Sequence, residues 1–310
     1  MTLPDEILTP AEAAALRLRG LFNAHGFARF EMSKFEAYEL YAANRAFLAS
    51  NDIIAFTGAG GKLMALRPDV TLSIVKNLKR VPDGISRLYY HENVYRRSGL
   101  GREFKERAQV GLECVGEIGV PEMSEVVALA AQSLETLGVR GCLDISHMGF
   151  LAALLDALSV DDETREILLR RIAEKNVAEV TRAAERAGAN ASALEKLIRL
   201  TGLYGKFRDV FPELQKLSVG ERTDAAAREL DALVTEVELR CPGADIRLDF
   251  SLVNDMRYYN GVIFQGYAQS VPTALLSGGR YDALLRQFGK QGGAIGFAVY
   301  VDLLGREEWK

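Results

Sequence analysis

Apolar residues recur at helical spacing near the start of the chain and again through its middle part. Thr9 is a suitable helix N-cap, Pro10 takes the first helical position and Glu12 lies three residues after the cap. Leucine and alanine then repeat at intervals of three and four up to Gly26. Residues 149–240 continue this period at length, with sparse glycine and many Ala, Leu, Glu and Arg residues. The pattern predicts an N-terminal helix and a helical block at 149–240.

Short apolar or alternating runs on both sides of that block predict strands. Residues 86–96 and 108–117 are strand-like, and the polar, glycine-bearing loop between them is typical of an antiparallel hairpin. Further strands are expected at 29–35, 62–66, 141–148, 245–253, 257–268 and 292–304. Because strands lie at both ends and helices lie between them, the pattern favours an α+β domain with a helical insertion.

Three local features refine this picture. The glycine cluster at 58–61 is interpreted as a hairpin turn and not as a phosphate-binding loop, because no Lys-Ser/Thr follows it at P-loop spacing. The next segment, 62–71, is expected to run from a strand into a helix capped by Asp69 or a neighbour. An amphipathic helix is expected over residues 122–137.

Composition narrows the class of protein. The chain has 310 residues, with 38 Lys and Arg against 42 Asp and Glu, so it lacks the basic excess that is usual for nucleic-acid binding. No apolar run approaches the length needed to span a bilayer, and the N-terminus does not resemble a signal peptide. We therefore expect a cytoplasmic protein that contacts no membrane.

Cysteine usage agrees with a reducing compartment. Cys114, Cys142 and Cys241 are far apart and odd in number, which indicates reduced thiols and not a disulfide framework. The three histidines are scattered, so no Cys/His metal spacing exists. Neither a metal site nor a cofactor is expected.

Several polar residues stand inside strand-like runs. Gln109 and Glu113 are four residues apart on one expected strand, so both side chains point to the same face. Residues 258–261 (YYNG) and 277–282 (SGGRYD) add tyrosines, an amide and an arginine close to other strands. Any one of these is more often a satisfied core group or a turn residue. Together they suit a small zwitterion with a hydrogen-bonding ring.

Six blocks in order give a more specific indication. They are LRPDVT (66–71), RLYYHENVYRR (87–97), AQVGLECVG (108–116), YYNGVIF (258–264), SGGRYDALL (277–285) and AIGFAVYVDLL (294–304). Together they resemble the class II aminoacyl-tRNA synthetase domain in its histidyl form, over nearly the whole chain. The resemblance implies a dimer built on an antiparallel sheet flanked by helices. It also implies a core formed by residues 1–148 and 241–310, with 149–240 as the helical insertion.

The resemblance also implies a histidine pocket. Its seven positions correspond here to Asp69, Thr71, Arg96, Gln109, Glu113, Tyr259 and Tyr281. An acid and an amide can take the ammonium group of histidine, and an arginine can take its carboxylate. Glu113 and the tyrosine hydroxyls are then left for the imidazole ring.

The positions that serve ATP in the synthetases have changed. Ser98 replaces the glutamate of the second motif, Leu303 replaces the arginine of the third motif, and Asn254 replaces a catalytic arginine. Positive charge on the phosphates is most of what a protein supplies to amino-acid activation, so these catalytic positions are expected to be lost. Arg257 lies near one lost position but falls where the synthetases have an acid, and Ser33 replaces the proline of the first motif.

These departures are similar to those of a paralogous family, the regulatory subunits of the two-component ATP phosphoribosyltransferase. The RPD-x-T block and an end at Lys310, which leaves no anticodon-binding domain, agree with that family. Membership implies a non-catalytic subunit that activates the short-form catalytic subunit in the first step of histidine biosynthesis. It also implies histidine as an allosteric effector, a homodimer within a hetero-oligomer, and no tRNA partner.

Two other functions remain open from the sequence. One is a histidyl-tRNA synthetase-like enzyme, or a truncated synthetase, that forms an aminoacyl-adenylate. The other is a scaffold without a ligand. Pyrophosphate exchange distinguishes the enzyme from the regulatory subunit.

Overall fold

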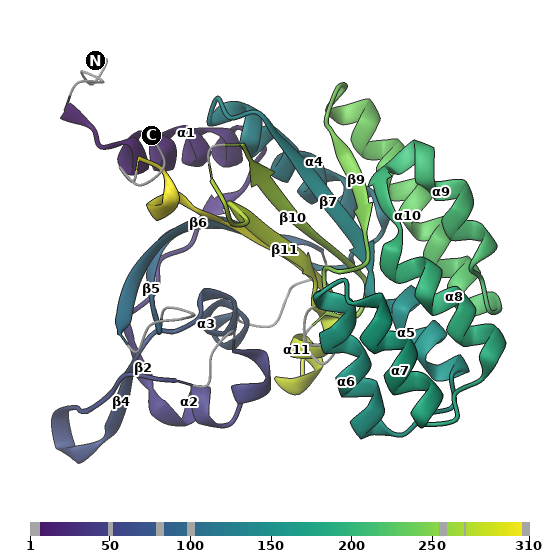
Figure 1. Ribbon diagram of the computed structural model, residues 1–310. Helices are drawn as coiled ribbons and strands as arrows, with labels where there is room; N and C mark the ends of the chain where they lie inside the picture. The colour runs from purple at the N-terminus through teal and green to yellow at the C-terminus, as the bar shows by residue number, and fades with distance from the viewer. Residues whose placement is uncertain are drawn as a thin grey trace.

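The computed structural model describes residues 7–48, 52–78, 84–97, 103–253, 259–269 and 271–305. Within these ranges the chain forms one nine-stranded sheet and one three-stranded sheet, with helices around them (Figure 1). The large sheet consists, in spatial order, of β1 (Ala28–Arg29), β5 (Ser86–Arg97), β6 (Phe104–Gly116), β12 (Gly293–Tyr300), β11 (Leu276–Arg280), β10 (Val262–Ala268), β7 (Gly141–His147), β9 (Ile246–Asp249) and β8 (Tyr204–Lys206).

The six strands from β5 to β7 in this order are all antiparallel, as expected. Parallel pairing occurs only toward the edges of the described sheet, where β1 lies beside β5 and β9 lies beside β7. The predicted hairpin at 86–117 is confirmed as the β5–β6 pair. The sheet is therefore mixed, and the predicted α+β class with an antiparallel sheet flanked by helices is confirmed.

The small sheet has the order β2 (Phe35–Ala37), β4 (Leu63–Leu66) and β3 (Ala55–Thr57). Between β3 and β4, Gly60 and Gly61 adopt positive φ angles of 71° and 77°, so the glycine cluster is the predicted hairpin turn.

The single strand predicted at 29–35 is wrong. The chain leaves the large sheet after Arg29 and enters the small sheet at Phe35. The cause is the fully buried Arg67, which donates from Nη1 to the Ser33 carbonyl and from its backbone N–H to the Lys34 carbonyl. These bonds pull the segment out of register with β5.

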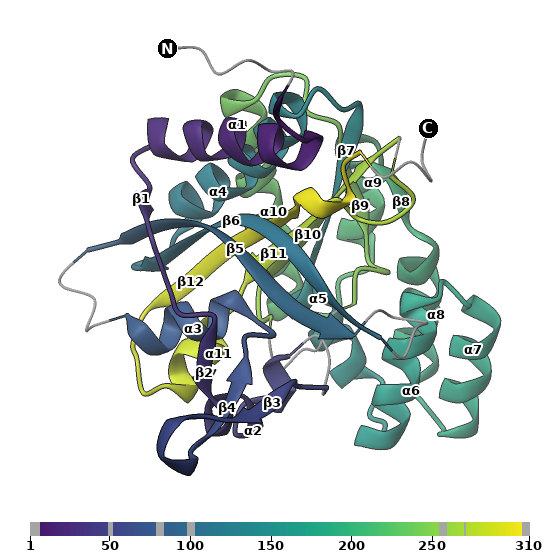
Figure 2. The ribbon, with the colours of Figure 1, turned by 90° about the vertical axis from the view of Figure 1, so that its left-hand side faces the viewer.

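Helices cover both faces of the large sheet. Figure 2 shows α1 (Pro10–Ala24) and α4 (Val120–Thr136) on one face, and α3 (Val70–Asn77) and α11 (Asp282–Gln287) on the other. The shorter helical segments are α2 (Tyr38–Ala42), η2 (Arg45–Phe47), η3 (Ala59–Gly61) and η4 (Val301–Leu303). The predicted capping box of α1 is present, because Glu12 N–H donates to Thr9 Oγ1 and Thr9 N–H donates to Glu12 Oε2.

The block at 149–240 is helical, as predicted, apart from the short strand β8. Its helices are α5 (Met148–Ala157), α6 (Asp162–Ala173), α7 (Val177–Arg186), α8 (Ala191–Gly202), α9 (Phe207–Lys216) and α10 (Glu221–Arg240). They stack beside the sheet, at the right of Figure 1, with α10 against α4 and α5. The division into core and insertion stays a prediction.

The three cysteines are free thiols. None of the described helices combines the length and the apolar character that crossing a membrane requires.

The alternation of β6 sets the position of the site. Val110, Leu112 and Cys114 point into the main core under α1 and α4. Gln109 and Glu113 point to the opposite face, toward α3 and α11. Polar side chains are thereby collected on one face of the sheet.

Candidate functional site

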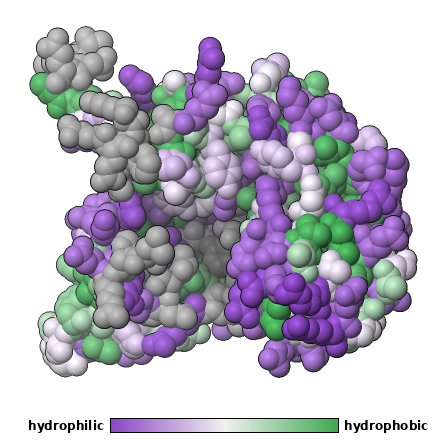
Figure 3. Space-filling model, in the orientation of Figure 1, coloured by the Kyte–Doolittle hydropathy of each residue, from purple (hydrophilic) through white to green (hydrophobic). Residues whose placement is uncertain are grey.

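A cavity of about 460 Å³ opens on the face of the sheet opposite α1 and α4. Figure 3 shows a hollow between the lobe of the small sheet and the helical block. The side chains on the visible surface of the helical block are mainly hydrophilic. The seven residues predicted for a pocket all line this cavity: Asp69, Thr71, Arg96, Gln109, Glu113, Tyr259 and Tyr281. The fold thus brings together positions that are more than two hundred residues apart in the chain.

Glu113 is a buried carboxyl at the bottom of the cavity, with 2% of its surface exposed. Thr71 Oγ1 donates to its Oε1 at 2.8 Å, and the Tyr281 hydroxyl donates to its Oε2. Burial raises the pKa of Glu113 to about 8, although the bonds from Tyr281 and Thr71 act in the opposite direction. The residue across from it on β12 is Gly296, where a Cβ would lie 1.8 Å from Glu113 Oε2. Glycine is therefore required there for the carboxyl to take this position.

Asp69 and Arg96 form an ion pair at the rim of the cavity. Asp69 caps α3 by accepting from the Leu72 N–H at 2.8 Å, as predicted, and its second oxygen lies 3.1 Å from Arg96 Nη2. Arg96 Nε also donates to the Pro68 carbonyl at 2.6 Å. Burial raises the pKa of Asp69, and the charge of Arg96 opposes this shift. The guanidinium is thus fixed between β5 and the start of α3.

Gln109 and Tyr90 present polar atoms to the cavity. Both are almost fully buried, and neither side chain has a hydrogen-bond partner within the described part of the chain. Their polar atoms are not among the fully enclosed unsatisfied atoms of the described chain and so reach the open space of the cavity, which suits this amide and this hydroxyl to bind a ligand.

Tyr90 was not among the predicted residues, because a tyrosine in a strand is usually a core residue. Its partner across the β5–β6 ladder is Gly111, where a Cβ would lie 2.4 Å from the Tyr90 hydroxyl. The signal that was available is the glycine between Gln109 and Glu113 on the same face of the strand, which makes room for a large side chain.

The far end of the cavity is polar and uncharged, and this end was also missed. Ser277 Oγ and the Tyr300 hydroxyl are 2.5 Å apart, from adjacent strands β11 and β12. Gln265 on β10 accepts from the Tyr267 hydroxyl at 2.7 Å. These side chains offer amide and hydroxyl groups and add no cation to the lining.

The positions expected to have lost ATP chemistry have separate locations. Ser98 and Asn254 lie outside the described residues, as does Arg257. Leu303 ends η4 and packs against the main core, and it does not line the cavity. Among the described lining residues, Arg96 is the one cationic side chain.

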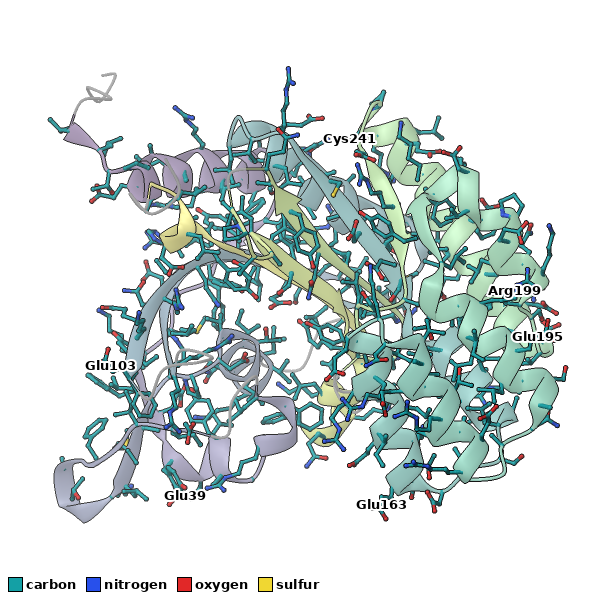
Figure 4. The ribbon with its side chains drawn as sticks, viewed as in Figure 1. Glu39, Glu103, Glu163, Glu195, Arg199 and Cys241 are labelled. Carbon is teal, nitrogen blue, oxygen red and sulfur yellow. The ribbon has the colours of Figure 1, made fainter. Side chains whose placement is uncertain are left out.

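The acids of the cavity are buried, unlike many others in the chain. Figure 4 labels Glu39, Glu103, Glu163 and Glu195, which lie on the outside of the molecule and point away from it. Within the described chain, no group of three or more acids, histidines and cysteines is placed to hold a metal ion. The cavity therefore presents two carboxyls, one guanidinium and neutral hydrogen-bonding groups, which suits a small zwitterion.

Comparisons with known proteins agree with this chemistry. The family model described as histidyl-tRNA synthetase matches residues 2–304. The chain is 30% identical to the ATP phosphoribosyltransferase regulatory subunit of Symbiobacterium thermophilum, over 95% of this chain and 76% of that protein. It is 26% identical to the protein of the same name from Oceanobacillus iheyensis, over 98% and 75%.

Solved structures show the same likeness. A crystal structure of an ATP phosphoribosyltransferase regulatory subunit/histidyl-tRNA synthetase from Bacillus halodurans C has a TM-score of 0.85 and 30% identity, over 98% of this chain and 80% of that one. The ATP phosphoribosyl transferase (HisG:HisZ) complex from Thermotoga maritima has a TM-score of 0.74 at 20% identity, over 94% and 97%, which shows the fold alone. The chain therefore belongs to the histidyl-tRNA synthetase family and, within it, to the ATP phosphoribosyltransferase regulatory subunits.

Proposed function

We propose that this chain is the regulatory subunit of an ATP phosphoribosyltransferase, which catalyses the first step of histidine biosynthesis. It activates a short-form catalytic subunit, and it lowers the activity of the complex when histidine occupies the cavity. The chain itself catalyses no reaction and needs no cofactor. It acts as a homodimer within a hetero-oligomer, so sedimentation of the purified chain as a monomer at all concentrations would contradict this part of the proposal.

The observation that carries the sensor role is the buried carboxyl of Glu113 beside unpartnered polar groups. A protonated imidazole ring placed between Thr71 and Tyr281 donates an N–H to Glu113, and its positive charge favours the ionised form of this carboxyl, which burial disfavours in the free chain. The α-carboxylate of histidine then faces Arg96, which is already oriented by the Pro68 carbonyl. The ammonium group faces Asp69 and the amide oxygen of Gln109.

The first test is calorimetric titration of the chain with histidine. Glu113→Gln keeps the shape of the side chain and removes its charge, so it should weaken binding by about 1.5–3 kcal/mol, which is roughly 10- to 150-fold. The control is Glu117→Gln, because Glu117 follows the same strand but is exposed, and its removal should leave the affinity unchanged.

The second test uses the assembled complex. Wild-type chain should raise the activity of a short-form ATP phosphoribosyltransferase and make it sensitive to histidine. Glu113→Gln should activate equally but require roughly 10- to 150-fold more histidine for inhibition, since the residue lies inside the cavity. No activation by the wild type would contradict the regulatory role. Indifference to millimolar histidine would remove the sensor role and leave an activating scaffold.

A further inference from the structure

The two tyrosine-bearing segments of the cavity are joined behind it by a buried polar cluster. Asp282, which follows Tyr281, has 6% of its surface exposed. Its Oδ2 accepts from Asn260 Nδ2 at 3.1 Å and from Arg280 Nε at 2.9 Å, and its backbone N–H donates to Asn260 Oδ1 at 2.9 Å. Asn260 follows Tyr259 directly. The residues beside both tyrosines are therefore bonded to one another, and the two segments are held as one unit.

Asp282 is also fixed to the sheet. Its Oδ1 accepts from the Ala294 N–H on β12 at 2.9 Å, and the Tyr281 N–H donates to the Ala294 carbonyl. This carboxylate holds three separate parts of the chain and does not itself line the cavity. It is a positioning residue for Tyr259 and Tyr281.

The same cluster reaches the helical block. Arg280 Nη1 lies 3.9 Å from Glu229 Oε2 on α10, and Glu229 Oε1 lies 3.0 Å from His147 Nε2. His147 Nδ1 accepts from the Phe150 N–H in the first turn of α5, so Nε2 carries the ring proton and donates to Glu229. The bond from His147 lowers the pKa of Glu229, which keeps this carboxyl ionised. A continuous series of polar contacts thus joins the cavity segments to α5 and α10.

One contact in this series is looser than the others. The neighbouring contacts are hydrogen bonds of 2.9–3.3 Å, whereas Arg280 and Glu229 form an ion pair at 3.9 Å, which is too long for a hydrogen bond. The same guanidinium nitrogen lies 3.7 Å from Met123 Sδ, which is a weak acceptor. A shift of Arg280 by about one ångström would bring it within hydrogen-bond distance of Glu229, so this pair is the contact where two arrangements of the series would differ.

A ligand in the cavity acts directly on the other end of this series. The Tyr281 hydroxyl is bonded to Glu113, whose carboxylate is the proposed partner of the imidazole. A ligand that forms a hydrogen bond with Glu113 changes the bond between Glu113 and the Tyr281 hydroxyl. The residues on either side of Tyr281 in the chain, Arg280 and Asp282, belong to the polar cluster.

We propose that occupancy of the cavity is transmitted to helices α5 and α10 through the Arg280–Glu229 ion pair. The identity of the ligand rests on the proposed function, whereas the route rests on the contacts above. Because α10 packs on α9 and α5 packs on α8, the signal is passed to further helices of the helical block.

The test is hydrogen–deuterium exchange of the full chain with and without millimolar histidine. In the wild type, histidine should slow exchange about fivefold or more at 276–287, at 148–157 and at 221–240. Glu229→Gln should bind histidine within about threefold of the wild type and keep the protection at 276–287, but lose it in the two helices. The matched control is Glu238→Gln, also on α10, whose partner is the exposed Arg208, and it should respond as the wild type does.

Two results would contradict the route. In the first, histidine protects α5 and α10 of Glu229→Gln as much as those of the wild type. In the second, the wild type binds histidine but exchange in α5 and α10 does not change. If the wild type binds no histidine, the proposed sensor role is wrong, and the route is then tested in the chain without ligand. Asp282→Asn should then speed exchange at 148–157 and 221–240, but only when Glu229 is present. If Asp282→Asn changes exchange equally with and without Glu229→Gln, or changes it in neither case, the proposed route is wrong.

Discussion

Glu113 is held where ionisation is costly, and this has a measurable effect on stability. Its pKa is raised from 4.5 to about 8 by burial, so between these values the folded chain holds a proton that the unfolded chain has released. Stability therefore falls as the pH rises through this window, by up to about 1.4 kcal/mol per pH unit for this group. Below about pH 4.5 both states are protonated, and the group contributes no pH dependence.

The corresponding prediction compares the wild type with Glu113→Gln in the absence of histidine. The free energy of unfolding of the wild type, relative to the variant, should decrease between about pH 5 and pH 8. Urea denaturation at several pH values measures it. Asp69 also has a raised pKa, and it is present in both proteins, so the part of its pH dependence that does not involve Glu113 cancels in the difference. A difference that does not change with pH would mean that Glu113 is ionised throughout.

Single residues also show how far the sequence alone identifies the site. Gln109 and Glu113 follow from strand alternation, because one face of β6 is apolar and the other is not. Tyr90 and Tyr300 do not follow from it, because alternation places a side chain on a face but does not show where that face is hollow. The spaces left by Gly111 and Gly296 create the hollow, and they arise from pairing between strands that are distant in sequence.

At the scale of elements, helix α3 depends on one residue with two roles. Asp69 caps the helix through Leu72 N–H and pairs with Arg96 through its other oxygen. Asparagine is as good an N-cap as aspartate, so Asp69→Asn removes the charge and keeps the cap. Asp69→Ala removes both, and it should be less stable than Asp69→Asn by about 1 kcal/mol.

Urea denaturation of the two Asp69 variants at one pH measures this difference. Thr9→Ala, which removes the cap of α1 far from the cavity, is the control and should cost a similar amount without changing histidine affinity. Equal stability of Asp69→Asn and Asp69→Ala would show that the cap contributes nothing and that the ion pair alone holds the start of α3.

Elements whose signals are local were predicted well. The N-cap residues Thr9 and Asp69 mark the starts of α1 and α3, and the helical spacing of apolar residues predicts the helical block. The segment at 29–35 was predicted wrongly because Arg67, which redirects it, lies more than thirty residues further along the chain. Strand β8 was missed for the same reason, since a three-residue strand exists only through its pairing with β9.

At the scale of the whole molecule, local patterns do not give the order of the strands. Strand β12 lies between β6 and β11, although about 180 residues separate it from β6, and only the six ordered blocks and their resemblance to a known family predict such a placement. The same comparison predicts which chemistry the molecule has retained. All seven residues predicted for the histidine pocket line the cavity, whereas Leu303 packs against the core.

This division leads to the prediction that the purified chain does not activate histidine. Arg96 is the one described cation that lines the cavity, and it is already bonded to Asp69 and to the Pro68 carbonyl. Each electrostatic donor to the phosphates is worth about 10²–10³ in rate, so the absence of arginine at Asn254 and Leu303 should lower activation by roughly 10⁴–10⁶. Histidine-dependent ATP–pyrophosphate exchange measures this, with a histidyl-tRNA synthetase as the positive control and histidine binding by the same sample as the test of folding. Exchange near the rate of the synthetase would replace the regulatory subunit with an enzyme that forms an aminoacyl-adenylate, because the phosphates would then be held by cations other than the lost arginines.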